Sequence, residues 1–261
     1  MISMVKQADY RKAQQLPFCY LCGETFVDDD TAADRDHVPP ENAFLKAHRE
    51  PLILPTHVAC NGAHNLVDEK IGQLIGLQHS KTLYDKSTRL EVDFNVATND
   101  LVVTNLDVDA AVWRWISGFH AALYQEPAVG IEKRGSLIAP LQRAHMENGR
   151  FKAEPLRPQH RNFVKTIKVN RLKGNLDIIQ TNKGMCRYEC VWAKFDNVDR
   201  WFCIFALNIY NWKELGADDG SQRGCAGCYE LVGSNVPATA SVEKTTPLIL
   251  PNLMPDDPFG S

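Results

Sequence analysis

Two short pairs of metal-ligand residues constrain this chain more than any other feature of its sequence. The first pair is Cys19-x-x-Cys22 followed by Gly23, and the second is His57-x-x-Cys60. A two-residue spacer closes a tight turn that can point both side chains at one ion. Together the pairs offer three thiolates and one imidazole, which suits a tetrahedral structural zinc site. The sequence therefore predicts one structural Zn²⁺ held by Cys19, Cys22, His57 and Cys60.

The fourth zinc ligand has an alternative in the sequence. Cys60 and His64 are four residues apart, so on a helix they would lie one turn from each other and could bind the same ion. Spacing alone leaves both His57 and His64 open as the histidine ligand.

The remaining cysteines offer a second, weaker metal pattern. Cys225-x-x-Cys228 repeats the spacing of the first pair, and Cys186-x-x-x-Cys190 lies upstream of it. Together they could hold a second zinc ion. However, Cys186, Cys190 and Cys203 stand in apolar runs, where a cysteine is usually a small core residue. The sequence favours the core role and leaves the second zinc open.

Composition bounds the class of protein. The chain has 261 residues, 44% hydrophobic and 23% charged, which excludes collagen-like and mostly disordered chains. A net charge of −3 excludes a uniformly basic coat for nucleic acid. No apolar run approaches the ~18–20 residues of a membrane span, and the polar N-terminus is not a secretory signal. We therefore expect a cytoplasmic protein without membrane contact, whose cysteines are reduced thiols or metal ligands.

Periodicity predicts an α+β fold. Residues 3–16 lack Pro and Gly and predict a polar helix, and Asp107 is a candidate N-cap for a helix over 108–124. Two runs, 185–195 and 201–210, are apolar at nearly every position and predict paired antiparallel strands. Because both faces of such strands are apolar, we expect both to be covered, by helices or by a second chain.

These elements suggest a division into three parts. Residues 1–80 would form a zinc-stabilised module, and residues 81–233 an accessory domain of helices and antiparallel strands for recognition, sensing or oligomerisation. Residues 234–261 include five prolines and predict an extended tail. A homo-oligomer formed through the second domain is one way to cover the apolar strands.

A basic stretch lies within the second part. Residues 143–173 contain nine Lys and Arg against two Glu, a local balance of +7. Several cations along one face can contact the phosphates of a duplex, although a solvated face that balances acidic segments elsewhere explains them equally well. The candidate nucleic-acid contacts are Arg157, Arg161, Lys165 and Lys168.

A third motif lies between the two zinc pairs. Asp36-His37 is followed by Val-Pro-Pro, and Asn61 comes directly after the last cysteine pair. In order and spacing, residues 17 to about 72 resemble the HNH endonucleases, which have the ββα-metal fold, in their zinc-clamped variety. The same register assigns His57 rather than His64 to the zinc ion. His57 stands where the family usually has Cys, and His64 stands near a position where many members have Lys.

The resemblance implies a role for each residue of the motif. His37 would be the general base, and Asp36 and Asn61 would hold a catalytic Mg²⁺ or Mn²⁺, with His64 as an extra ligand or a phosphate contact. Adjacent residues on a strand point to opposite sides, so bringing Asp36 and His37 into one site requires a distorted strand end near Pro39. The implied activity is hydrolysis of phosphodiester bonds, with double-stranded DNA as the expected substrate and restriction or phage defence as the expected setting.

Two other hypotheses remain open from the sequence. One is a non-catalytic zinc module that binds nucleic acid or a partner protein. The other makes residues 81–233 a sensor or oligomerisation domain that gates the nuclease.

Overall fold

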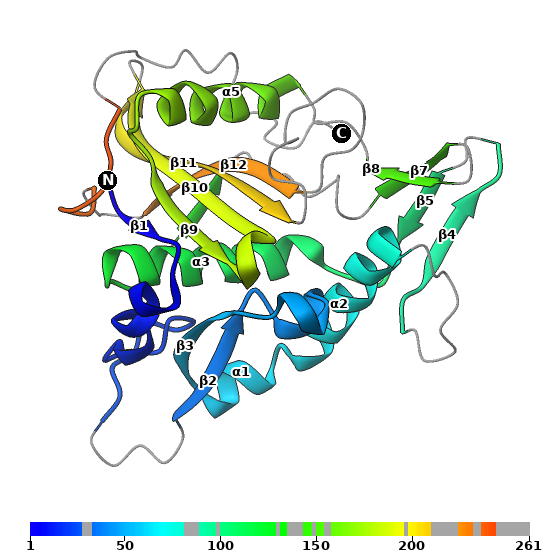
Figure 1. Ribbon diagram of the computed structural model, residues 1–261, viewed down its shortest axis with the longest axis horizontal. Helices are drawn as coiled ribbons and strands as arrows, with labels where there is room; N and C mark the ends of the chain where they lie inside the picture. Colours follow the sequence, from blue (N-terminus) through cyan, green and yellow to red (C-terminus); the bar gives the residue numbers. More distant parts are fainter. Residues whose placement is uncertain are drawn as a thin grey trace.

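The computed structural model confirms a mixed α+β protein, with strands and helices interleaved along the chain (Figure 1). Arg157 and most of the predicted tail lie outside the described residues. The described residues are 1–27, 33–80, 89–97, 100–128, 131–134, 143–147, 150–153, 158–195, 198–209, 224–231 and 236–243.

A six-stranded sheet forms the centre of the molecule, and its order is β1-β9-β10-β11-β12-β6. The β1–β9 pair is parallel and all other neighbours are antiparallel. The predicted strand pair is confirmed, although β11 begins three residues earlier than expected. The strands are β1 (Ser3–Met4), β6 (Ile131–Arg134), β9 (Asp177–Thr181), β10 (Cys186–Phe195), β11 (Val198–Ile209) and β12 (Gly224–Leu231).

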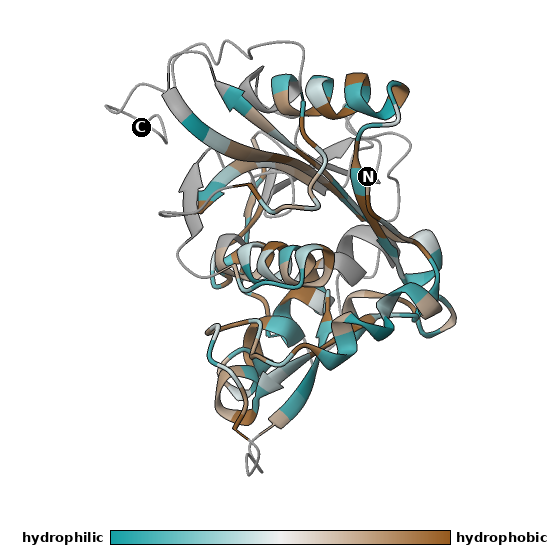
Figure 2. Cartoon of the chain, turned by 90° about the vertical axis from the view of Figure 1, so that its left-hand side faces the viewer, coloured by the Kyte–Doolittle hydropathy of each residue, from teal (hydrophilic) through white to brown (hydrophobic). Residues whose placement is uncertain are grey.

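Two helices cover the two faces of this sheet. Helix α3 (Val108–Tyr124) lies on one face and α5 (Pro158–Leu172) on the other (Figures 1 and 2). The predicted bounds of α3 and its cap are confirmed, since the Asp107 side chain accepts a hydrogen bond from Ala110 N at 2.9 Å. Coverage from both sides explains why β10 and β11 are apolar at nearly every position.

The N-terminal segment does not form the predicted helix over residues 3–16, and that prediction is wrong. Ser3–Met4 form β1, followed by two short 3₁₀ helices, Gln7–Arg11 and Ala13–Gln15. Three of its buried side chains recur every third residue, at Tyr10, Ala13 and Leu16. That repeat matches the three residues per turn of a 3₁₀ helix rather than the 3.6 of an α-helix.

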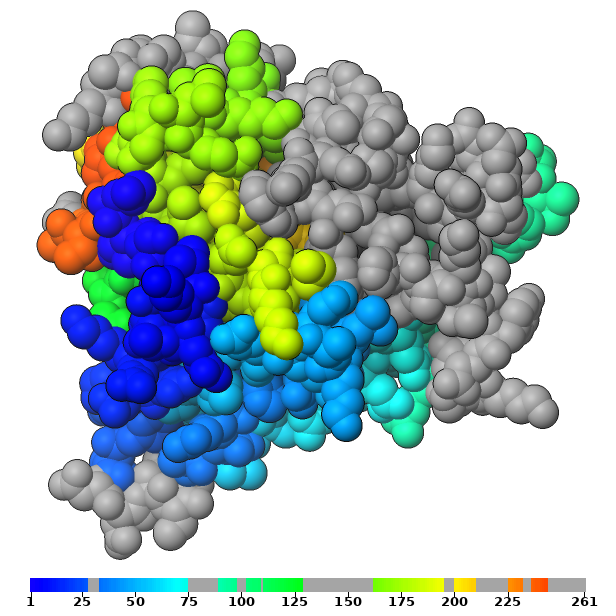
Figure 3. Space-filling view, viewed as in Figure 1, coloured from blue at the N-terminus to red at the C-terminus, as the bar shows by residue number. Residues whose placement is uncertain are grey.

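A buried carboxylate joins the two ends of the described chain. Asp177 is fully buried and accepts hydrogen bonds from Ile2 N at 2.6 Å, Ser241 N at 2.6 Å and Tyr124 OH at 3.1 Å. Figure 3 shows the N-terminal residues and the orange segment 236–243 close together at the left. The first residues of the chain thus belong to the central sheet, although the other strands of that sheet come much later in the sequence.

A separate two-stranded sheet carries the candidate site. Strands β2 (Ala33–Val38) and β3 (Leu52–His57) are antiparallel, with Asp36 opposite Leu54 and His37 opposite Ile53. Two helices follow at once, α1 (Val58–Gly62) and α2 (Asn65–Ser80). The remaining sheet consists of β4 (Val92–Asn95), β5 (Asp100–Val103), β7 (Arg143–Glu147) and β8 (Arg150–Ala153). Short 3₁₀ helices lie at Glu41–Ala43, Lys46–His48 and Asn182–Gly184.

Helix α3 packs closely on the β2–β3 pair because it presents a glycine there. A Cβ at Gly118 would lie 2.9 Å from Val38 Cγ1 and 3.1 Å from Leu54 Cδ1. The hydrophobic core continues from this contact into the central sheet without a break. The β2–β3 pair is therefore fixed directly against the helix that lines the sheet.

Candidate functional site

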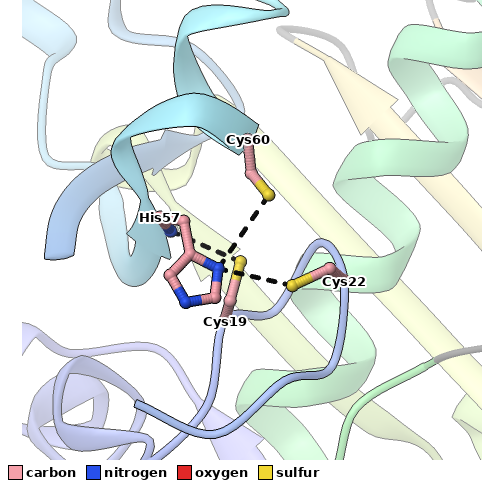
Figure 4. A group of neighbouring side chains, drawn as sticks. All are labelled: Cys19, Cys22, His57 and Cys60. Carbon is pink, nitrogen blue, oxygen red and sulfur yellow. Dashed lines mark hydrogen bonds between the residues drawn. The ribbon is translucent and has the colours of Figure 1, made fainter. Parts of the chain in front are cut away.

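Three sulfurs and one imidazole nitrogen converge where β3 passes into α1. The ligand atoms of Cys19, Cys22, His57 and Cys60 all lie within 4.8 Å of one another (Figure 4). His57 Nδ1 is 3.4 Å from Cys22 Sγ and 4.0 Å from Cys60 Sγ. Cys19 is buried and the other three are half-buried. Four donor atoms this close together form a candidate metal centre.

Local backbone structure explains why the first cysteine pair closes. Gly23 N donates to Cys19 O at 2.8 Å, and Cys19 N donates to Glu24 O at 2.9 Å. Gly23 has a φ of 82°, in the left-handed region that glycine adopts without strain. The His57 backbone N–H also donates to Cys19 Sγ at 3.4 Å. The turn therefore holds the first cysteine against the residue that ends β3.

The thiols of this group differ in acidity because burial, hydrogen bonds and mutual repulsion act on each of them to a different extent. Burial raises the pKa of Cys19, but hydrogen bonds from Thr56 and from the backbone outweigh it and bring the pKa to about 7. Burial, followed by the charges of Cys19 and Cys22, raises the pKa of Cys60 to about 12. Three thiolates therefore resist ionising together, and a bound cation would remove that repulsion.

This donor set fits zinc, which binds soft sulfur and imidazole ligands in tetrahedral geometry. The group contains His57, as the sequence predicted, and His64 lies outside it. The predicted Cys₃His group is therefore confirmed as one that could hold a metal such as zinc. Within the described ranges it is the one group of this kind.

The second cysteine pattern has a structural explanation that excludes a shared ion. Cys225 and Cys228 lie on β12, opposite Leu207 and Ile204 of β11. Residues three apart on a strand point to opposite faces of the sheet. Both thiols are buried in the core, as are those of Cys186 and Cys190. The same spacing that forms a metal turn at Cys19 therefore separates the two thiols here.

Asp36 is buried and fully engaged. Tyr20, which lies between Cys19 and Cys22 in the sequence, donates a hydrogen bond from its hydroxyl to Asp36 Oδ2. Arg114 Nη2 from α3 lies 3.3 Å from Asp36 Oδ1 and 3.2 Å from Oδ2. Burial and then the charge of Asp36 raise the pKa of Tyr20, so its hydroxyl stays protonated and remains a donor.

Arg114 also joins a second carboxylate to this cluster. Its Nη2 lies 2.7 Å from Oδ2 of Asp68, in the first turn of α2. His64 is half-buried nearby, and burial followed by the charge of Arg114 lowers its pKa, so its imidazole is neutral at pH 7. Sequence reasoning missed Arg114, although its position between Trp113 and Trp115 was a signal, because a charge within an apolar helix requires a buried partner.

Within the described part of the chain, neither of the other two predicted catalytic side chains, His37 and Asn61, forms a hydrogen bond with Asp36. His37 is half-buried opposite Ile53, on the face of β2 away from Asp36, and its imidazole has no hydrogen-bond partner among the described residues. Asn61 Nδ2 donates to Asp34 Oδ2 at 2.9 Å. This hydrogen bond is the main cause of the lowered pKa of Asp34. The structure thus brings Asn61 to β2, but against Asp34 rather than Asp36.

A catalytic divalent ion fits poorly at Asp36 in this arrangement. Mg²⁺ and Mn²⁺ need the lone pairs of carboxylate and amide oxygens at short distances. The Arg114 guanidinium already lies beside both oxygens of Asp36, and the Tyr20 hydroxyl donates to one of them. An ion can bind Asp36 only if Arg114 moves away.

The part of the basic stretch that forms α5 lies on the other side of the central sheet from this cluster. Lys165 and Lys168 are exposed on α5, which covers the face of the central sheet opposite α3 and the β2–β3 pair (Figure 1). Arg161 is also on α5, and Arg157 falls outside the described residues. A nucleic acid on α5 would therefore contact the side of the molecule away from Asp36.

Comparisons with protein-family models, curated proteins and solved structures find no match to this chain. Among the helices of the described residues, none combines the length and apolar character of a membrane span.

Proposed function

We propose that this chain is a metal-dependent endonuclease of the HNH type, which hydrolyses phosphodiester bonds in double-stranded DNA. One observation carries the proposal. The antiparallel pair β2–β3 is followed directly by α1, with Asp36 and His37 on the first strand and Asn61 on the helix. A metal ion bound by the Cys₃His group would join the end of β3 to the turn at Cys19 and so clamp this ββα unit.

The chemistry of the proposed reaction matches the residue types of the unit. A neutral imidazole can take a proton from water near pH 7, which is the role of His37. The half-buried position of His37, with no competing hydrogen bond among the described residues, leaves a ring nitrogen available for that role. Asp36 and Asn61 would hold the divalent ion once the Arg114 guanidinium no longer occupies the oxygens of Asp36, with His64 as a further ligand or phosphate contact. That ion would supply charge neutralisation at the phosphate and at the leaving oxygen.

The experiment is cleavage of plasmid DNA by the zinc-loaded full chain, with Mg²⁺ or Mn²⁺ and with EDTA. We expect cleavage that requires the divalent ion, and a loss of about 10²–10⁴ in rate for His37→Ala. Zinc content and melting temperature should stay near those of the unmodified chain. His48→Ala is the matched control, because it removes a half-buried histidine from the β2–β3 connection, which belongs to neither strand nor to α1. Equal activity of the His37 variant and the unmodified chain would refute the assignment.

A second function is favoured by the Arg114 contact. A buried guanidinium that neutralises Asp36 is what a structural role of this carboxylate requires. The chain would then be a non-catalytic zinc module that binds nucleic acid or a partner protein. This alternative predicts bound zinc, no cleavage with any divalent ion, and unchanged binding after His37→Ala.

A further inference from the structure

A single nitrogen atom lies among three carboxylate oxygens at the junction of β2, α2 and α3. Arg114 Nη2 is 3.2 and 3.3 Å from the two oxygens of Asp36 and 2.7 Å from Asp68 Oδ2. The side chains of Arg114 and Asp36 are 3% and 6% exposed, so water screens this contact little. Two carboxylates directed at one buried position form a cation site, and the cation present is the guanidinium.

The charges of this cluster do not balance. Arg114 contributes one positive charge, whereas Asp36 and Asp68 contribute two negative charges when both are ionised. Asp68 Oδ1 and Arg114 Nη1 are buried without a hydrogen-bond partner among the described residues. The guanidinium therefore satisfies the site only in part, and a divalent cation would match its charge better.

A divalent ion and Arg114 cannot occupy this position together. An ion bound by both carboxylates would lie about 2.0–2.6 Å from the same oxygens that now contact Nη2. The two cations would overlap and repel each other at that range. Arg114 belongs to α3, outside residues 1–80, so a side chain from another part of the protein decides whether the carboxylates are accessible to an ion.

We propose that Arg114 is an autoinhibitory cation, which occupies the divalent-ion position at Asp36 and Asp68 and excludes an ion for as long as its guanidinium stays there. This inference rests on the proposed function for its consequence in catalysis, and it adds Asp68 as the second carboxylate of the ion site, since Asn61 contacts Asp34. Its central claim, competition between Arg114 and a divalent ion, can be tested without nucleic acid. The occupant of the opened site would be a hard divalent cation such as Mn²⁺, held by two carboxylates beside the neutral His64 imidazole.

The test is a Mn²⁺ titration of the zinc-loaded full chain, in which electron paramagnetic resonance measures the concentration of free Mn²⁺. We expect Arg114→Met to bind Mn²⁺ at least about tenfold more tightly than the unmodified chain, a change of about 1.4 kcal/mol. Arg114→Lys is the matched control, because it keeps a positive charge and should leave Mn²⁺ binding weak. Adding Asp36→Asn to Arg114→Met should abolish the gain.

Stability gives a second readout for the same variant. Removing one partner of a buried ion pair leaves unpaired charge, so zinc-loaded Arg114→Met should melt at a lower temperature without added Mn²⁺, and Mn²⁺ should restore the melting temperature. If the variant does not fold without Mn²⁺, the proposal requires Mn²⁺ to fold it. A variant that gains neither Mn²⁺ affinity nor Mn²⁺-dependent stability overturns the proposal.

Cleavage assays separate this inference from the nuclease assignment. Faster Mn²⁺-dependent cleavage by Arg114→Met supports both. Tighter Mn²⁺ binding without cleavage by either protein supports the competition and removes the nuclease function. Cleavage by the unmodified chain, together with no gain of Mn²⁺ binding in the variant, overturns the inference and leaves the nuclease function in place.

Discussion

The close contact between α3 and the β2–β3 pair can be measured with two glycine substitutions. Gly118→Ala would place a Cβ 2.9 Å from Val38 Cγ1 and 3.1 Å from Leu54 Cδ1. Carbon atoms in contact normally lie about 3.5–4.0 Å apart, so the helix or the strand pair has to move by several tenths of an ångström. Gly62→Ala in α1 is the control, because a Cβ there meets nothing within 4 Å.

The expected difference follows from two opposing terms. Replacing glycine by alanine in a helix favours folding by about 0.5–1 kcal/mol. Overpacking a core contact costs about 1–3 kcal/mol. Only the first term acts at Gly62, whereas both act at Gly118. We therefore expect Gly62→Ala to be slightly more stable than the unmodified chain. The unfolding free energy of Gly118→Ala should be lower than that of Gly62→Ala by about 1–3 kcal/mol.

Guanidinium unfolding of the zinc-loaded protein measures both free energies, with tryptophan fluorescence as the signal, since two of the five tryptophans, Trp113 and Trp115, lie on α3. Equal stabilisation by the two substitutions would show that α3 does not pack against β2 at this distance. That result would also remove the structural basis for the contact between Arg114 and Asp36.

Three further predictions concern the Cys₃His group and the buried Asp177. His57→Ala should lose zinc during purification with EDTA while His64→Ala retains about one zinc per chain, and metal analysis showing the reverse would contradict the ligand assignment. Zinc affinity should fall as pH falls, because thiols protonate: the pKa of Cys19 is about 7 and those of the other two thiols are raised, so binding releases about two protons above pH 7 and about three below it. A chelator competition series across pH 6 to 8.5 measures this slope, and a pH-independent affinity would refute thiolate ligation. Asp177→Ala leaves buried donors of Ser241 and its neighbours without an acceptor, so unfolding free energy should fall by about 3 kcal/mol or more, and by less for Asp177→Asn, which keeps one acceptor oxygen.

Local features of the chain were determined by the sequence itself. The Cys19-x-x-Cys22 turn needs only a short spacer and Gly23, and both act within a few residues. Asp107 caps α3 through a hydrogen bond to a residue three positions away, and the apolar runs at 185–195 and 201–210 pair with each other across a short connection. Because these interactions are short-range in sequence, residue type and spacing were enough to predict them.

Tertiary structure decided the features that depend on distant residues. Residues 3–16 have helical composition, but burial of Tyr10 and Leu16 and the pairing of Ser3 with β9 select strand and 3₁₀ helix instead. The same C-x-x-C spacing forms a turn at Cys19 and lies on a strand at Cys225, where alternation separates the thiols.

The surroundings of Asp36 also came only from the folded chain. Its partner Arg114 is 78 residues away in sequence, and the two meet because Gly118 allows α3 to approach the strand. A sequence motif specifies which side chains are present on β2. Which charge neutralises Asp36 depends on the packing of a helix from another part of the chain, because a buried carboxylate needs a paired charge and only the folded chain brings Arg114 to it.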